Sequence, residues 1–174
     1  MLGGVDSRTH DVLASIYEGF DVSVPRIRTN TSTAEMIKYT SNAVLATLIS
    51  FSNEIARLCS VVGDVDAIEV MRGVHQATYF TTRRDGQRIT ASITSFLEPG
   101  CGFGGSCLPK DVTALVGQGR THDLPLPLLR SVLDINKGQV DEMLRLVGKH
   151  FSDLRDVPGC RARHRVQAGY GRRA

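Results

Sequence analysis

The longest regular pattern of apolar positions runs from Ser32 to Gly63, and it predicts a helix. Apolar side chains recur there every three to four residues, the spacing of an α-helix. These positions are Ile37, Val44, Leu45, Leu48, Ile49, Ile55, Leu58 and Val61. Ser32 and Glu35 have the spacing of a capping box, so we expect Ser32 to cap a helix of about 28 residues, roughly 40 Å long. Such a helix usually packs in a bundle or across a subunit interface.

Shorter patterns precede this helix. After a Gly-Gly turn at the start, an amphipathic segment from Ser7 to Phe20 predicts a helix, and alternation from Val22 to Thr29 predicts a short strand. Pro25 lies inside that strand, which favours an edge position. An α/β unit would need earlier strands to pair with, so we interpret these elements as the end of one.

The patterns after the long helix are mostly helical as well. A shorter helix is expected from Asp64 through Val74, and another from Val112 to Gly119. Pro125 and Pro127 then open one periodic segment that continues to Val147, in agreement with the rules for helix starts. Residues 75–95 carry several arginines and few large apolar side chains, so we expect an exposed connection there. The fold class is therefore mainly α.

Composition places the chain among soluble globular proteins. Of its 174 residues, 41% are hydrophobic and 22% charged. We find neither a signal-peptide pattern nor a window approaching the roughly 18 apolar residues of a membrane span, so we expect a cytoplasmic protein without a membrane partner. The four cysteines show neither a paired framework nor zinc spacing, so we expect free thiols and no metal, with Cys59 as a small core residue.

The net charge of +3 has a local source. Residues 160–174 contain five arginines and no acidic residue, and without them the balance is slightly acidic. Nucleic-acid binding would depend on this tail alone, which has no recognisable module. We therefore expect no nucleic-acid partner.

The strongest chemical signal is a glycine-rich loop that ends at Cys107. Glycines allow a loop to fold its amides around a phosphate or a sugar. We expect Cys107 at a loop-to-helix junction, where Lys110 and the positive end of a helix would favour the thiolate. Loop and nucleophile together indicate covalent catalysis on a phosphorylated ligand. The alternative is a buried structural thiol.

Two further pairs have helical spacing. Lys38 and Asn42 stand four residues apart and share one helix face, while Asp111 follows Cys107 by four. Each also has an ordinary interpretation, because a solvated lysine or a carboxylate in the first turn of a helix is common.

Taken together, the segments Lys38-Tyr39-Thr40-Ser41-Asn42-Ala43 and Gly102-Phe103-Gly104-Gly105-Ser106-Cys107-Leu108-Pro109-Lys110-Asp111 resemble the UDP-glucose/GDP-mannose dehydrogenase family. The resemblance runs from about Gly3 to Pro158. It implies three parts: residues 1–30 as the end of an NAD-binding domain, residues 31–150 as the central helical dimerisation domain, and residues 151–174 as the start of a nucleotide-sugar-binding domain.

The resemblance implies oxidation of the primary alcohol of a nucleotide sugar to a carboxylate, with two NAD+ and no metal. Cys107 would attack the aldehyde intermediate to give a thiohemiacetal and then a thioester. Lys38 would stabilise the developing oxyanion, Asn42 would position that oxygen, and Asp111 would act as the base for hydrolysis.

The same resemblance assigns the binding residues and the partner. Cys107 and Lys110 would lie at the cofactor. The substrate would be bound by Lys38, Asn42, Arg88, Phe96, Leu97, Glu98, Gly100, Gly102, Phe103 and Gly104. Arg88 resembles an arginine that reaches the substrate site of a partner subunit. The helix at 32–62 would form the core of a homodimer.

The chain also departs from the family pattern. No G-x-G-x-x-G follows a strand, so the dinucleotide fingerprint is missing. The tail from Cys160 to Arg173 is compatible with codons whose shifted frame reads A-V-L-G-I-A-F-K-P-G-T-D-D-V, as that family's C-terminal domain opens. We interpret the tail as a frameshifted remnant; the alternative is a basic interaction arm. We therefore expect a fragment without NAD-dependent activity of its own. The alternative function is a non-catalytic helical dimerisation module.

Overall fold

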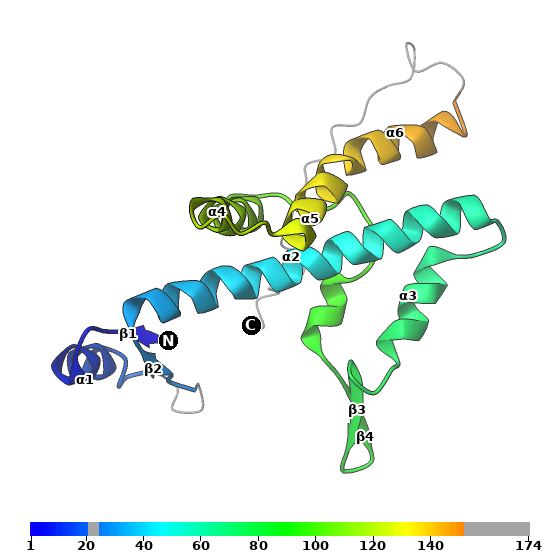
Figure 1. Ribbon diagram of the computed structural model, residues 1–174. Coiled ribbons are helices and arrows are strands. Elements are labelled where there is room, and N and C mark those ends of the chain that lie inside the picture. Colours follow the sequence, from blue (N-terminus) through cyan, green and yellow to red (C-terminus); the bar gives the residue numbers. More distant parts are fainter. Residues whose placement is uncertain (21–24, 152–174) are drawn as a thin grey trace. The chain divides into compact units, whose positions relative to one another are not determined.

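The computed structural model describes residues 1–20 and 25–151, and it divides the chain into two compact units. One unit runs from Met1 to Asn42 and the other begins at Ala43, so each is described by itself. The first part of the expected strand at 22–29 and the tail interpreted as frameshifted lie outside the described residues. Figure 1 shows the order of the elements along the chain.

The first unit begins with a parallel strand pair. Strand β1 (Leu2–Gly3) pairs with β2 (Arg28–Thr29), and helix α1 (Ser7–Ile16) lies between them in sequence. The side chain of Asp6 caps α1 by accepting from the Thr9 amide at 2.7 Å. The expectation of a turn at the first glycines was wrong, because Gly3 is part of the strand. The parallel pairing agrees with the interpretation as part of an α/β unit.

Helix α2 (Thr31–Val62) has 32 residues and begins one residue earlier than expected. Its cap is Asn30 and not Ser32, because the Asn30 Oδ1 accepts from the Thr33 amide at 2.8 Å. An asparagine at this position caps as well as a serine does. The helix ends at Gly63, whose φ of +82° is left-handed, the usual helix stop.

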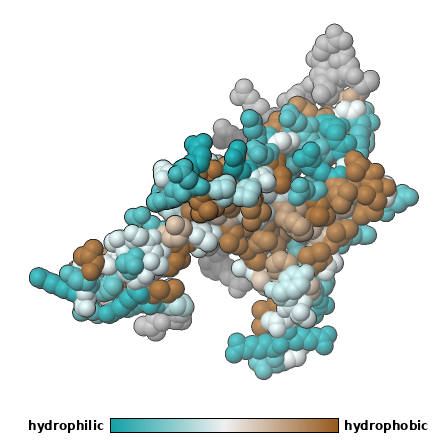
Figure 2. Space-filling model, in the orientation of Figure 1, coloured by the Kyte–Doolittle hydropathy of each residue, from teal (hydrophilic) through white to brown (hydrophobic). Residues whose placement is uncertain are grey.

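Within the second unit, α2 buries mostly small and polar side chains, and several of its large apolar ones are exposed. Its buried residues there are Ala43, Ala46, Ile49, Ser50, Ser52, Asn53 and Cys59. Val44, Phe51, Leu58 and Val62 are each at least half exposed. These four residues follow one face at helical spacing, and we call them the α2 stripe. Figure 2 shows apolar surface along this part of the helix. Cys59 is a core residue, as expected.

By length and composition alone, α2 would also suffice to cross a membrane, which corrects the expectation that no window has this character. The mean hydropathy of its 18-residue window is 1.3, and 33% of the window is buried. Core helices of globular proteins reach such values too. Buried polar contacts agree with a core helix here, since the Ser50 hydroxyl donates to the Val132 carbonyl at 3.1 Å.

The expected exposed connection at 75–95 is partly regular. Helix α3 (Ala67–His75) starts later than expected because Asp66 caps it. Strands β3 (Thr81–Arg84) and β4 (Gln87–Thr90) then form an antiparallel hairpin. Asp85 and Gly86 close it with φ of +51° and +77°, as a two-residue type I′ turn requires. The 3-10 helix η1 (Ser92–Phe96) follows.

Three helices complete the second unit: α4 (Leu108–Thr121), α5 (Pro127–Lys137) and α6 (Gln139–Gly148). The single segment expected after Pro127 is thus two helices, separated at Gly138, where the weak helix propensity of glycine permits a break. The core contains Ala43, Ala46, Ile49, Phe103, Leu108, Val112 and Val132. The mainly helical fold class is confirmed.

Candidate active site

The glycine-rich loop from Leu97 to Cys107 joins η1 to α4, and two buried side chains anchor it. Leu97 is 2% exposed, while Phe103 is 4% exposed and belongs to the helical core. The loop backbone has no strand partner. Its shape is therefore set by buried anchors and by side chains from other elements.

Three side-chain amides hold the backbone of this loop. Asn136, near the end of α5, accepts from the Phe103 amide at 2.7 Å and donates to the Phe103 carbonyl at 2.9 Å. Asn53 on α2 accepts from the Gly100 amide at 2.7 Å. Gln139, which opens α6, donates to the Gly100 carbonyl at 2.7 Å. We call Asn53, Asn136 and Gln139 the amide clamp. Sequence reasoning missed all three, although polar residues within apolar helical patterns were a signal.

Cys107 is the residue directly before α4, as expected for a loop-to-helix junction. It is exposed, so the alternative of a buried structural thiol is wrong. Its carbonyl accepts from the Asp111 amide at 2.9 Å, which closes the first turn of α4. The Ser106 hydroxyl lies 3.8 Å from the Cys107 sulfur.

Asp111 is 2% exposed and lies one turn beyond Cys107. Its Oδ1 lies 2.5 Å from the Nζ of Lys110, whose side chain is 63% exposed. The buried carboxylate therefore has an adjacent ammonium group that reaches solvent. A carboxylate in the first turn of a helix also interacts favourably with the helix dipole.

Phe96 is half-buried against the core, and Glu98 is exposed. Gly102 and Gly104 are half-buried, on either side of Phe103. Gly100 is the exposed residue whose backbone the clamp holds. The structure thus brings the expected loop residues together with Cys107, Lys110 and Asp111 in one unit.

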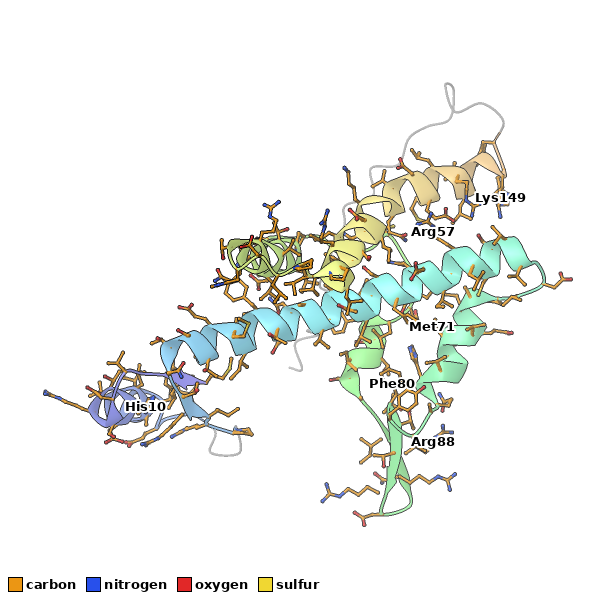
Figure 3. All side chains as sticks on the ribbon, in the orientation of Figure 1. His10, Arg57, Met71, Phe80, Arg88 and Lys149 are labelled. Carbon is orange, nitrogen blue, oxygen red and sulfur yellow. The ribbon has the colours of Figure 1, made fainter. Side chains whose placement is uncertain are left out.

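The remaining expected site residues belong to other elements of the chain. Lys38 and Asn42 belong to the first unit, where they stand four apart on α2, Lys38 exposed and Asn42 half-buried. Arg88 is exposed on β4, and its guanidinium donates to the side-chain oxygen of Gln76. Figure 3 shows Arg88 on the hairpin, near Phe80 at its base.

A pocket of about 130 Å³ lies behind Gly100, between α2 and α6. Arg57, Gln139, Glu142 and Met143 help to line it. The pKa of Glu142 is lowered, first by hydrogen bonds from the Arg145 guanidinium and further by the charges of Arg145 and Arg57. Arg145 also donates to the Ser60 hydroxyl at 2.8 Å, so charged and polar groups join α6 to α2.

The described residues carry neither the fingerprint of a dinucleotide site nor a cluster of metal ligands. Gly100, Gly102 and Gly105 have the bare spacing G-x-G-x-x-G, but the element before them is the 3-10 helix η1. A dinucleotide fingerprint needs a strand there, so these residues do not fit NAD. Across residues 1–20 and 25–151, no group of three or more His, Cys, Asp or Glu side chains could hold a metal ion.

Comparisons with known proteins match this architecture. The family model for the central domain of the UDP-glucose/GDP-mannose dehydrogenase family matches residues 32–138. GDP-mannose 6-dehydrogenase of Pseudomonas putida (strain KT2440) is 39% identical over 150 residues, covering 86% of this chain and 31% of that protein. UDP-glucose 6-dehydrogenase TuaD of Bacillus subtilis (strain 168) is 37% identical over 152 residues, covering 85% and 30%.

A solved structure is similar as well. A UDP-glucose dehydrogenase from the hyperthermophilic archaeon Pyrobaculum islandicum superposes with a TM-score of 0.74 at 29% identity, covering 88% of this chain and 32% of that one. The chain thus spans about a third of the length of the relatives it matches.

Proposed function

Because the chain belongs to the UDP-glucose/GDP-mannose dehydrogenase family, we propose that it supplies the cysteine-bearing central part of a nucleotide-sugar 6-dehydrogenase. The proposed reaction oxidises the primary alcohol of a nucleotide sugar, such as UDP-glucose or GDP-mannose, to a carboxylate. NAD+ would accept the two hydrides. Since the described residues do not fit that cofactor, we assign no hydride step to them.

One observation carries the proposal: an exposed thiol ends a loop whose backbone is held in place, with a buried carboxylate one turn further on. A thiol so placed can attack a carbonyl carbon. The Cys107 sulfur forms a bond to the aldehyde carbon, the carbonyl π electrons move to oxygen, and that oxygen gains the proton that the thiol gives up. The resulting thiohemiacetal retains the aldehyde and has again a C–H bond that can lose hydride.

After the second oxidation the sugar is held as a thioester. Water then attacks the acyl carbon, the C–S bond breaks, and the carboxylate leaves as the thiol is restored. We assign Asp111 as the base that takes the proton of this water. Its neighbour Lys110 places an ammonium group 2.5 Å from this carboxylate.

The other roles are part of the same proposal. Lys38 would stabilise the oxyanion, and Asn42 would position that oxygen. Residues 96–104 would wrap the nucleotide sugar, and Arg88 would reach the substrate of a partner subunit. Because the fingerprint for NAD is missing, we expect no NADH from this chain with NAD+ and either UDP-glucose or GDP-mannose. Measurable NADH would contradict that expectation.

The test uses the neighbouring cysteine as a matched control. Cys101 and Cys107 are both exposed and lie in the same loop. The full chain is treated with iodoacetamide, with and without the 6-aldehyde of UDP-glucose or of GDP-mannose, and each cysteine is quantified by peptide mass spectrometry. We expect the aldehyde to slow alkylation of Cys107 at least about ten-fold and that of Cys101 much less. Equal effects at both cysteines would sink the proposal.

The α2 stripe favours the second candidate, a dimerisation module. Val44, Phe51, Leu58 and Val62 form a continuous apolar face, while small and polar residues fill the opposite face. A second copy of the chain could cover that face with the same residues, as an isologous interface does. We expect a dimer by light scattering at micromolar concentration, and a monomer for Phe51→Glu combined with Leu58→Glu. A monomeric parent would rule this candidate out.

The two candidates can be separated in one preparation. A dimeric parent whose Cys107 ignores the aldehyde would be a dimerisation module only. If the aldehyde protects Cys107, the catalytic proposal holds whatever the mass.

A further inference from the structure

We propose that Asn136 is a positioning residue for the reaction proposed above, acting through the backbone of the glycine-rich loop. Its side chain holds the backbone of Phe103, which lies 33 residues away in the sequence and four before Cys107. Its effect on the thiol would be transmitted by Phe103. The effect on the reaction of Cys107 rests on the proposed function, whereas the hydrogen bonds between Asn136 and Phe103 do not.

Both ends of the Asn136 amide bind one residue. The oxygen accepts from the Phe103 N–H at 2.7 Å, and the nitrogen donates to the Phe103 C=O at 2.9 Å. The side chain thus does for Phe103 what a neighbouring strand does in a sheet. The pair fixes the backbone on both sides of the residue, because a donor and an acceptor are satisfied at once.

The loop sequence fits closely around this amide. Gly102 has a φ of +83°, and a Cβ on it would lie 2.3 Å from the Asn136 oxygen. Any other residue at 102 would therefore clash with Asn136 and also strain its own backbone. Glycine at position 102 therefore allows both the close approach of the Asn136 side chain and the left-handed backbone conformation.

Phe103 then acts as a fixed point for the segment that presents the thiol. Its ring is buried in the core, and its backbone is held by Asn136. On the other side, Leu108 is 5% exposed and belongs to the same core. Cys107 is exposed between these two anchors, so its position follows from theirs. A thiol that must meet one carbon of a sugar gains from such preorganisation.

The other two clamp residues act one step earlier in the loop. Asn53 and Gln139 hold the N–H and the C=O of Gly100, each at 2.7 Å. Two side chains are thus needed to bind both backbone groups of Gly100, whereas Asn136 alone binds both backbone groups of Phe103. Loss of either leaves Gly100 with one bond, whereas loss of Asn136 removes both bonds of Phe103, so Asn136 is the clamp residue with the largest expected effect.

The chemistry of an amide provides a sharp test. In Asn136→Asp the ionised carboxylate can still accept from the Phe103 N–H, but it cannot donate, and its charge faces the Phe103 carbonyl. The protonated carboxylic acid has one donor and one acceptor again. The variant should therefore regain the clamp as the pH falls through the pKa of the new carboxyl. Asn136→Ala cannot regain it at any pH.

The first experiment follows hydrogen exchange of the backbone amides at 100–106 in the full chain, by mass spectrometry from pH 4 to 7. Rates are expressed as the ratio of variant to parent at each pH, which removes the intrinsic pH dependence. Two lost hydrogen bonds predict exchange about ten-fold faster for Asn136→Ala at every pH. Asn136→Asp should match it at pH 7 and approach the parent at pH 4. Gln118→Ala, which removes an exposed amide of α4 bonded to His122, should match the parent throughout.

The second experiment repeats the aldehyde protection of Cys107 with these variants at pH 7. We expect protection to fall about ten-fold in Asn136→Asp and to be kept in Gln118→Ala. If Asn136→Asp shows no exchange change and no recovery at low pH, Asn136 does not hold the loop, and the inference is overturned. Full protection of Cys107 despite a loosened loop would overturn it too. If the parent itself shows no protection, the proposed function fails, and the exchange ratios alone then decide whether Asn136 fixes the loop.

Discussion

The glycine-rich loop and the β3–β4 hairpin lie in the same unit and are built in opposite ways. The hairpin satisfies its backbone with its own ladder, and every residue from 82 to 90 is exposed. The loop has no ladder, yet it contains two of the most buried apolar residues, Leu97 and Phe103. The backbone polar groups of Gly100 and Phe103 are met by side chains from α2, α5 and α6.

The difference shows that regular structure and a fixed position are separate properties. A two-stranded hairpin with little buried surface is marginally stable on its own. An irregular loop can be held firmly when its anchors belong to the core and its amides are paired. In this unit the candidate nucleophile is on the irregular, anchored segment.

The largest expected contrast comes from removing one apolar side chain in each region. Phe103→Ala should cost about 3–5 kcal/mol of unfolding free energy, because it leaves a cavity in the core beside Val112 and Leu108. Ile89→Ala on the hairpin, where the parent side chain is 47% exposed, should cost about 0.5 kcal/mol. Urea denaturation measures both. Similar losses would mean that Phe103 does not anchor the loop.

The second contrast uses two glycines with nearly equal backbone conformation. Gly102 and Gly86 have φ of +83° and +77°, so alanine at either should cost about 1–2 kcal/mol. At Gly86 nothing lies within 4 Å of the added carbon, whereas at Gly102 it meets Asn136. We therefore expect Gly102→Ala to cost about 1–2 kcal/mol more than Gly86→Ala in the same urea experiment. Equal costs would show that loop and clamp separate without penalty.

The sequence predicted the features that depend on neighbouring residues and missed those that depend on distant ones. The chemistry of the loop was readable, because glycines, a cysteine and a following helix are adjacent in the chain. The clamp was not, because Asn53 and Asn136 lie 47 and 33 residues from the backbone they hold. Only packing of α2 and α5 brings them there, and periodicity does not give the partners of a helix.

Two local features were predicted incompletely, because neighbouring residues favoured different interpretations. Asp85-Gly86 is a strong hairpin signal, but the surrounding arginines favoured an exposed connection. Both readings hold, since the segment is a hairpin and is exposed. At the start of α2, the cap is Asn30 in place of the expected Ser32, because the Asn30 Oδ1 accepts from the Thr33 amide. The long helix itself was predicted because its apolar positions are numerous, although several of its large apolar residues, such as Phe51 and Leu58, face outward.

A third contrast concerns acid. The pKa of Glu142 is lowered by its hydrogen bonds with Arg145, and this ion pair lies on α6, behind the clamp. A carboxyl with a lowered folded pKa stabilises the fold above its ordinary value of about 4.5, and this contribution is lost as the pH falls through the lower folded pKa. We expect Glu142→Gln to be less stable than the parent at pH 7 and to converge with it as the pH falls below 4.5 through the lower folded pKa of Glu142.

The hairpin provides the control for that experiment. Arg84 and Asp85 lie 3.9 Å apart with side chains 81% and 95% exposed, so their pairing is screened by water. Asp85→Asn keeps a residue that tolerates the left-handed turn. Its unfolding free energy should follow the parent at every pH. A similar loss of unfolding free energy in both variants would indicate a general charge effect, and the pH dependence would then not be specific to the Glu142–Arg145 pair.

The smallest expected effect concerns charge on the hairpin itself. Arg83 and Arg88 are direct cross-strand partners, and like charges in that position destabilise a strand pair by about 0.2–1 kcal/mol. Arg83→Gln removes the repulsion at similar length, while Arg83→Lys keeps the charge. We expect amide exchange in β3 and β4, followed by NMR, to slow about two-fold in the Gln variant and to stay at the parent rate in the Lys variant. Added salt should narrow the gap, because exposed charges are screened. The amides of Gly100 and Phe103 should not respond to either change, since their partners are the neutral side chains of Asn53 and Asn136. A response there would show that the hairpin and the loop are one cooperative element, and the contrast between them would be lost.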